Sequence, residues 1–237
     1  MSNRSIHTLL KNWDEECPLT REEAVEVLNL PEEEMDSLME CAYALRTKYK
    51  GKKVSVQLLT NVRSGNCTQN CAYCAQSKDS QAEIEKYKRV SDEKLYGDND
   101  LVDEKHLARH CIGLSGIGFS DEEIEDLADR IREMKKKDTQ ICCSIGFLTE
   151  KQARILKDAG LDRINHNLNS SRSFYPEICT THTYDQRVNN IKMLQSLGFE
   201  ICSGGIVGMG ESKEDIVDML MDLREINPES VPINFLL

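Results

Sequence analysis

The sequence lacks any long apolar segment and any sign of an N-terminal leader. No apolar run in its 237 residues approaches a membrane span, and residues 1–5 hold no hydrophobic region. Basic residues are also few, because 30 Lys and Arg stand against 41 Asp and Glu, which gives a formal net charge of -11. This acidic balance argues against nucleic acid or an anionic membrane as a partner. We therefore expect a cytoplasmic protein.

Low-complexity segments and interdomain linkers are also missing, and the length suits one sizeable core. Cysteine, by contrast, is abundant, with ten residues. A secreted disulfide scaffold could use that many, but this chain is long, helical in pattern and without a leader. In a reducing cytosol the same count indicates metal or redox chemistry.

Two regions differ in their hydrophobic pattern. Residues 1–50 predict an N-terminal helical extension, with a capping box that begins at Thr20 and a second helix that begins at Pro31. In residues 51–237, strand-like runs alternate with amphipathic helices, and strands are expected at 54–59, 110–114, 140–145, 162–168, 200–207 and 231–236. This alternation predicts an α/β fold with a parallel sheet. About six β/α units correspond to an incomplete TIM-type barrel.

The chain ends directly after the sixth strand-like run. Six units fall short of the eight that close a barrel, and natural termini rarely finish inside a core strand. We therefore expect a fragment that ends before the last barrel strands. Residues 77–105 are polar and weakly patterned, and we expect one helix there with an irregular loop at 97–100.

The strongest chemical signal is a cysteine triplet on the loop after the first strand. Cys67, Cys71 and Cys74 have the spacing C-x3-C-x2-C. Three thiolates can hold a [4Fe–4S] cluster and leave its fourth iron open, as a catalytic metal centre requires. A structural zinc site usually has four ligands, and no fourth Cys or His lies within this loop. The spacing therefore favours an iron–sulfur cluster.

With Tyr73 just before the last cysteine, this loop resembles the signature of the radical S-adenosylmethionine (SAM) superfamily. In that superfamily SAM chelates the open iron and is cleaved to a 5′-deoxyadenosyl radical. The segments 165–169, 202–211 and 231–234 narrow the resemblance to the biotin synthase family. It runs from about residue 20 to the end of the chain, with residues 80–108 more divergent.

The resemblance implies sulfur insertion into dethiobiotin, with an auxiliary iron–sulfur cluster, most simply [2Fe–2S], as the sulfur donor. It also implies an electron donor such as flavodoxin or ferredoxin, a homodimer, and no catalytic residue beyond the cofactors. The positions that match the family's binding residues are Cys111, Cys142 and Cys202 for the auxiliary cluster, Tyr73, Asn167, Asn169, Arg187, Gly204, Gly208 and Glu211 for SAM, and Asn167 and Asn234 for dethiobiotin. The family's fourth auxiliary ligand is an arginine on a strand beyond residue 237, which leaves the cluster type open.

Strand alternation, which does not depend on the family resemblance, also predicts that these thiols face inward. Successive side chains point to opposite faces, and Ile141, Cys143 and Ile145 form one apolar set. Cys142 is therefore expected to face the barrel interior, and Cys143 is expected to be a buried core residue. Cys111, Cys202 and Asn234 oppose apolar neighbours in the same way.

The asparagine run follows the same rule. Asn165, Asn167 and Asn169 should share the inward face, and His166 should face the helices as a core histidine. Barrel interiors are usually filled with branched aliphatic side chains. A lining of Cys, Asn and Gly instead fits a space that holds cofactors and substrate.

The remaining cysteines, Cys17, Cys41 and Cys179, and the other histidines are interpreted as structural or exposed. Two alternatives stay open. One is another radical SAM enzyme of the same branch, such as a hydrogenase-cofactor maturase or a methylornithine synthase, although these do not generally combine three inward cysteines with the asparagine run. The other is a non-catalytic iron–sulfur or zinc-binding protein, which would not explain the asparagine-lined strands.

Overall fold

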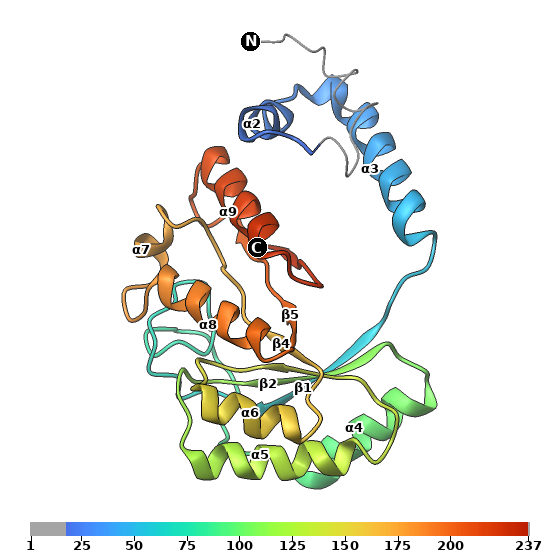
Figure 1. Cartoon of the computed structure of the whole chain (residues 1–237). Coiled ribbons are helices and arrows are strands. Elements are labelled where there is room, and N and C mark those ends of the chain that lie inside the picture. The colour runs from blue at the N-terminus through green and yellow to red at the C-terminus, as the bar shows by residue number, and fades with distance from the viewer. Residues whose placement is uncertain (1–17, 237) are drawn as a thin grey trace.

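The computed structural model describes residues 18–236 and contains a parallel sheet with helices packed along its outer face (Figure 1). Five strands pair in sequence order, from β1 to β5, and β6 and β7 form a second, two-stranded sheet. The strands are β1 (Gln57–Arg63), β2 (Arg109–Leu114), β3 (Ile141–Ser144), β4 (Arg163–Asn165), β5 (Glu200–Cys202), β6 (Gly205–Val207) and β7 (Ile233–Phe235). The helices are α2 (Arg21–Leu28), η1 (Glu32–Glu34), α3 (Met35–Lys50), α4 (Asp92–Glu104), α5 (Asp121–Met134), α6 (Glu150–Asp158), α7 (Tyr175–Ile178), α8 (Tyr184–Ser196) and α9 (Lys213–Ile226). This order confirms an α/β fold of the partial-barrel type.

The helix starts follow the sequence signals. The capping box at Thr20 is present, with its hydroxyl bonded to the N3 backbone N–H and the N3 side chain bonded back to the cap. The same reciprocal pair begins α5, α6, α8 and α9. These caps satisfy backbone donors that the first helical turn leaves free.

The core lies between the sheet and its helices. Ile112, Ile141, Ile164 and Ile201, on four successive strands, have no exposed surface, and neither has Cys143. They pack in one cluster with buried side chains of α5 and α6. The opposite face of these strands carries thiols, since Cys111 on β2 pairs in register with Cys142 on β3.

Several strands differ from the sequence prediction, and the run expected at 162–168 is a strand only from Arg163 to Asn165. The first was expected at 54–59 but runs from Gln57 to Arg63, and Val54 and Val56 before it are exposed. The run 200–207 is divided into β5 and β6. At the break, the Ser203 N–H donates to Ser230 O and the Gly204 N–H donates to Asn167 Oδ1, so neither continues a ladder with β4.

The irregular loop expected at 97–100 is wrong, because α4 runs through these residues. Asp98 accepts from the Thr60 hydroxyl, and Asn99 contacts His110 Nδ1 and donates to Met134 O. These buried tertiary contacts outweigh the low helix propensity of Gly, Asp and Asn.

The N-terminal extension contacts the rest of the molecule through α2. Arg21 forms an ion pair with Asp218 on α9, and Arg224 donates to Leu19 O. In Figure 1, α2 and α3 lie away from the five-stranded sheet, and α3 has no buried residue. The division at residue 50 stays a prediction, and Cys17 lies outside the described residues. Within residues 18–236, no helix combines the length and apolarity that crossing a membrane requires.

Candidate active site

The cysteine loop leaves the end of β1 and is fixed at both ends by hydrogen bonds. Gly65 adopts a positive φ of 73°, its N–H donates to Gln76 Oε1 at 2.6 Å, and its carbonyl accepts from the Ser115 hydroxyl at 2.6 Å. Farther along, the Lys78 N–H donates to Gln69 O at 3.0 Å. These bonds fold the loop over the ends of the strands.

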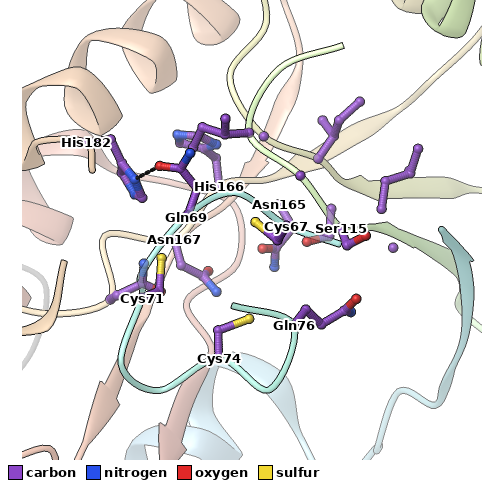
Figure 2. Close-up of a pocket in the computed structure, with 18 of the residues that line it drawn as sticks. Cys67, Gln69, Cys71, Cys74, Gln76, Ser115, Asn165, His166, Asn167 and His182 are labelled. Atoms are coloured by element: carbon purple, nitrogen blue, oxygen red, sulfur yellow. Dashed lines mark hydrogen bonds between the residues drawn. The ribbon is translucent and has the colours of Figure 1, made fainter. Parts of the chain in front are cut away.

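The loop encloses a cavity of about 310 Å³. Cys67, Cys71 and Cys74 all line it, and Figure 2 shows them around one space into which Asn165 and Asn167 also reach. The lining further includes Tyr73, Asn169 and Arg187 from the expected SAM set. The structure therefore gathers seven of the expected site residues, which are Cys67, Cys71, Cys74, Tyr73, Asn167, Asn169 and Arg187.

The thiol of Cys71 is the buried one of the three in the loop, while Cys67 and Cys74 are partly exposed. Burial, together with the neighbouring Cys179, raises the pKa of Cys71 to about 12, although Tyr73 donates a hydrogen bond to its sulfur. A buried thiol stays protonated unless a cation takes the place of the proton. Bound iron would supply that positive charge, so this environment suits a thiol that loses its proton only when it binds a metal.

Arg187 organises the opposite wall of the cavity. Its guanidinium donates to Asn167 O at 3.1 Å, to His182 Nε2 at 2.8 Å and to the Tyr175 hydroxyl. His182 Nδ1 also lies 3.0 Å from Gln69 Oε1, the contact drawn in Figure 2. A fixed cation beside a polar cavity is suited to binding a carboxylate.

The expectation that His166 faces the helices is wrong. His166 lines the cavity together with Asn165 and Asn167, and its side chain is 2% exposed. The reason is that β4 ends at Asn165, so the strand alternation does not extend to the next residues. Burial, with the nearby charge of Arg187, lowers the pKa of His166 to about 3, and its Nε2 has no hydrogen-bond partner among the described residues.

A second group of thiols lies inside the barrel, outside the lining of the cavity. Cys142 donates to the sulfur of Cys111, and this bond is the largest cause that lowers the pKa of Cys111. Burial works against that effect, while the charges of Arg109 and Arg163 add to it. Cys202 accepts from Asn165 Nδ2 at 3.3 Å, so Asn165 connects this group to the cavity.

Cys143 is separate from this thiol group, as the strand alternation predicted. It belongs to the core cluster on the helix-facing side, and burial raises its pKa. Its neighbour Cys142 forms the bond to Cys111 on the inner face. The alternation rule therefore separated two adjacent cysteines correctly.

Besides the three thiols of the second group, four expected site residues do not line the cavity: Gly204, Gly208, Glu211 and Asn234. Glu211 accepts from the backbone N–H groups of Gly208 and Met209, both at 2.7 Å, and so stabilises the turn after β6. Gly204 lies so close to Pro232 that a Cβ there would overlap the proline carbonyl oxygen. Asn234 is an exposed residue of β7. These observations give Gly204, Gly208 and Glu211 a structural reason to be present.

Residues 61–223, which contain the cysteine loop and most of the cavity, match the model of the Radical SAM superfamily. The chain belongs to the radical SAM superfamily. Members of this superfamily use a [4Fe–4S] cluster and SAM, as the sequence comparison predicted.

Among curated proteins, this radical SAM chain is similar to bacterial biotin synthases. It is 41% identical to the biotin synthase of Geobacillus kaustophilus over 219 residues, which is 92% of this chain and 66% of that protein. The corresponding identity is 40% for Bacillus subtilis, with 92% and 65% covered, and 40% for Rhodopirellula baltica, with 92% and 61% covered. The chain thus spans about two thirds of the length of these relatives.

Solved structures of radical SAM enzymes share the fold. A methylornithine synthase superposes with a TM-score of 0.85 at 17% identity, covering 98% of this chain and 68% of that one. A [FeFe]-hydrogenase maturase from Carboxydothermus hydrogenoformans has a TM-score of 0.81 at 20% identity, covering 98% and 56%. At these identities the likeness concerns the fold alone.

The radical SAM cofactors fit the donors that this site offers. Three thiols on one short loop are suitable iron ligands, and the unpartnered Nε2 of His166 is a buried polar atom that a ligand could satisfy. At the second thiol group, Arg109 Nη1 is likewise buried and unpartnered within the described part of the chain. Such a donor suits an anionic cluster.

Sequence reasoning missed Gln69, Gln76, Ser115 and His182, which line the cavity, and Cys179, which contacts Cys71. His182 stands just before the capping box of α8, a position that carries no periodic signal. Cys179 lies 108 residues from Cys71. Only the tertiary fold brings these residues to the cysteine loop.

Proposed function

We propose that this chain forms the cofactor-binding part of a biotin synthase, an enzyme that inserts sulfur into dethiobiotin. The observation that carries the proposal is the second thiol group, in which Cys111, Cys142 and Cys202 face inward from three strands. Identity of about 40% to biotin synthases over 92% of the chain supports it. The activity belongs to a protein of the full length of those relatives.

In this proposal Cys67, Cys71 and Cys74 hold the [4Fe–4S] cluster. With that cluster and SAM bound, the site would supply a 5′-deoxyadenosyl radical on one-electron reduction. The chain's own contribution is alignment and exclusion of water. Arg187, held by three hydrogen bonds, would orient an anionic group of SAM, and Tyr73 and Asn169 would close the sides of the cavity.

The substrate would lie between the two thiol groups. Asn167 would donate to the ureido oxygen of dethiobiotin, because it lines the cavity and its backbone is fixed by Arg187. Asn234, although exposed, is hydrogen-bonded through its strand to β6 and is the second proposed ureido contact. The segment 204–211, in which Gly204 precedes β6 and Gly208 and Glu211 form the turn after it, would support the adenosine side of SAM.

The second cluster, most simply [2Fe–2S], would be held by Cys111, Cys142 and Cys202 and would donate the sulfur. The arginines at positions 109 and 163 would offset its negative charge. Resemblance to the family adds two further proposals: reduction by a flavodoxin- or ferredoxin-type protein and assembly as a homodimer. The acidic composition adds the proposal of a cytoplasmic location.

The deciding experiment compares two adjacent cysteines in anaerobically reconstituted protein of the full length of those relatives. Cys142→Ser should lose the iron and sulfide of one cluster and all biotin formation, yet retain SAM cleavage. Cys143→Ser, the matched control, should keep both clusters, because its side chain lies in the core.

Two results would contradict the proposal. If Cys143→Ser alone removed the second cluster, the ligand assignment would be wrong. If the unaltered protein cleaved SAM in the presence of dethiobiotin but formed neither biotin nor a thiolated intermediate, another radical SAM reaction would be favoured.

A further inference from the structure

Cys179 is a buried thiol beside the cysteine loop that the proposed chemistry does not use. Its sulfur lies 3.8 Å from the sulfur of Cys71, and the two residues are 3% and 8% exposed. Cys179 follows α7, a short helix far along the chain from the loop. Two thiols so close and so well buried form a defined pair.

The backbone around this pair is fixed by hydrogen bonds between the two segments. The Ala72 N–H donates to Ile178 O at 2.9 Å. Asn70 adds a second connection, because its Nδ2 donates to Thr180 Oγ1 at 2.7 Å and its Oδ1 accepts from the Thr180 N–H at 3.1 Å. These hydrogen bonds hold the two segments side by side, with the sulfurs of Cys71 and Cys179 only 3.8 Å apart.

The same thiols could in principle bind a metal with His182, since all three ligand atoms lie within 4.8 Å of one another. The hydrogen bonds argue against that reading. Arg187 can only donate, so His182 Nε2 accepts its bond at 2.8 Å and the ring proton resides on Nδ1. Nδ1, which lies 3.3 Å from Cys179, therefore offers a proton rather than a lone pair. The two sulfurs are left as the reactive groups.

We propose that Cys71 and Cys179 form an oxidation-sensitive pair that closes into a disulfide when the iron–sulfur cluster is lost. The two thiols give up two protons and two electrons, and hydrogen peroxide takes them up and becomes two molecules of water. The sulfurs approach from 3.8 Å to about 2.05 Å as the bond forms. A thiol reductant reverses the step.

The pair responds to the state of the cluster because Cys71 cannot take part in both bonds. While iron binds the sulfur of Cys71, that sulfur is not available to form a disulfide with Cys179. Once the iron leaves, an isolated Cys71 would be oxidised stepwise to sulfinic and sulfonic acids, which are not recovered by thiols. The disulfide stores Cys71 in a recoverable form. This inference rests on Cys71 as a cluster ligand and is independent of sulfur insertion.

The test exposes the anaerobic holoenzyme to increasing hydrogen peroxide, blocks free thiols, and maps peptides without reduction. We expect a peptide that joins Cys71 to Cys179, accumulating as the cluster absorbance falls. After treatment with a thiol reductant and renewed reconstitution, most of the original iron should return. Cys143→Ser, which removes a buried thiol elsewhere, should behave like the unaltered protein.

Cys179→Ser should form no such peptide, should accumulate sulfinic acid at Cys71, and should recover several-fold less iron after reduction. Its iron content and SAM cleavage before peroxide should match the unaltered protein. If Cys179→Ser does not fold, Cys179→Ala serves for the same comparison. Pairing of Cys71 mainly with Cys67 or Cys74, or equal recovery of iron with and without Cys179, would overturn the proposal. Neither result would affect the assay for biotin formation.

Discussion

Replacing Glu200 with glutamine should destabilise the barrel interior beside the second thiol group. The Glu200 Oε2 atom lies 3.0 Å from Arg109 Nη2 and 2.8 Å from Arg163 Nη2. Glu200 also pairs in register with Arg163, which pairs with Cys142. The Glu200 carboxylate therefore lies between the guanidinium groups of Arg109 and Arg163, next to the thiols, and forms an ion pair with each of them.

The magnitude follows from how far each group is buried. The side chains of Arg109 and Arg163 are 10% and 14% exposed, while that of Glu200 is 44% exposed. Breaking a fully buried ion pair costs about 3–5 kcal/mol, and an exposed pair contributes about 0–1 kcal/mol. With one partly solvated partner, and one hydrogen bond retained by the amide, we expect a loss of about 2 kcal/mol.

The assay is thermal unfolding of the anaerobic, cluster-loaded protein by circular dichroism. For a chain of this size, that loss corresponds to a decrease of roughly 4–8 °C in Tm. The exposed Glu225→Gln is the matched control and should change Tm by less than about 2 °C. A Glu200→Gln protein as stable as this control would refute the reasoning that the carboxylate holds the two arginines together.

Three other changes test separate parts of the account. Gly204→Ala should lower the unfolding free energy by about 3 kcal/mol in urea titrations, because the added Cβ overlaps the carbonyl oxygen of Pro232. Stability should also fall as the pH drops from about 6.5 toward 4, since burial lowers the pKa of His110 to about 4 and of His166 to about 3. As the pH falls below about 6.5, these histidines are protonated in the unfolded chain but stay neutral in the folded one. The free energy of unfolding therefore falls by roughly 2 kcal/mol per histidine by pH 5, and the full stability is present only above about pH 6.5. Arg187→Lys should weaken SAM binding roughly tenfold in equilibrium dialysis, because lysine keeps the charge but loses the planar set of donors.

Each of these predictions has a control or a result that would contradict it. For the glycine, Gly97→Ala is the control, because a Cβ there meets open space within α4 and should be neutral or slightly stabilising. An unfolding free energy that is flat between pH 7 and 5 would contradict the proton linkage. Unchanged SAM affinity in Arg187→Lys would remove the arginine from the binding site.

The sequence predicted those parts of the site that depend on local spacing. The cysteine loop is readable because three cysteines lie within eight residues, and the opposite orientations of Cys142 and Cys143 are readable because they occupy a regular strand. His166 was misplaced because regular alternation ends one residue earlier, at Asn165. A pleat argument therefore fails at the carboxyl end of a strand, which is where barrel enzymes place their sites.

What the sequence could not predict depends on contacts between distant segments. Residues 97–100 look like a loop by propensity, and only their buried partners make them helical. Cys179 looked inert for the same reason, since its contact with Cys71 joins residues 108 positions apart. Local chemistry and periodicity specify single elements, and the packing of those elements specifies which side chains meet.

The central claim is that the loop of Cys67, Cys71 and Cys74 supports cleavage of SAM through an iron that has no protein ligand. The most direct measurement is the release of 5′-deoxyadenosine by anaerobically reconstituted protein with a strong reductant. We expect release that depends on SAM and iron and disappears in Cys71→Ala. Absence of 5′-deoxyadenosine from protein that holds a complete cluster, or equal release by Cys71→Ala, would contradict the account.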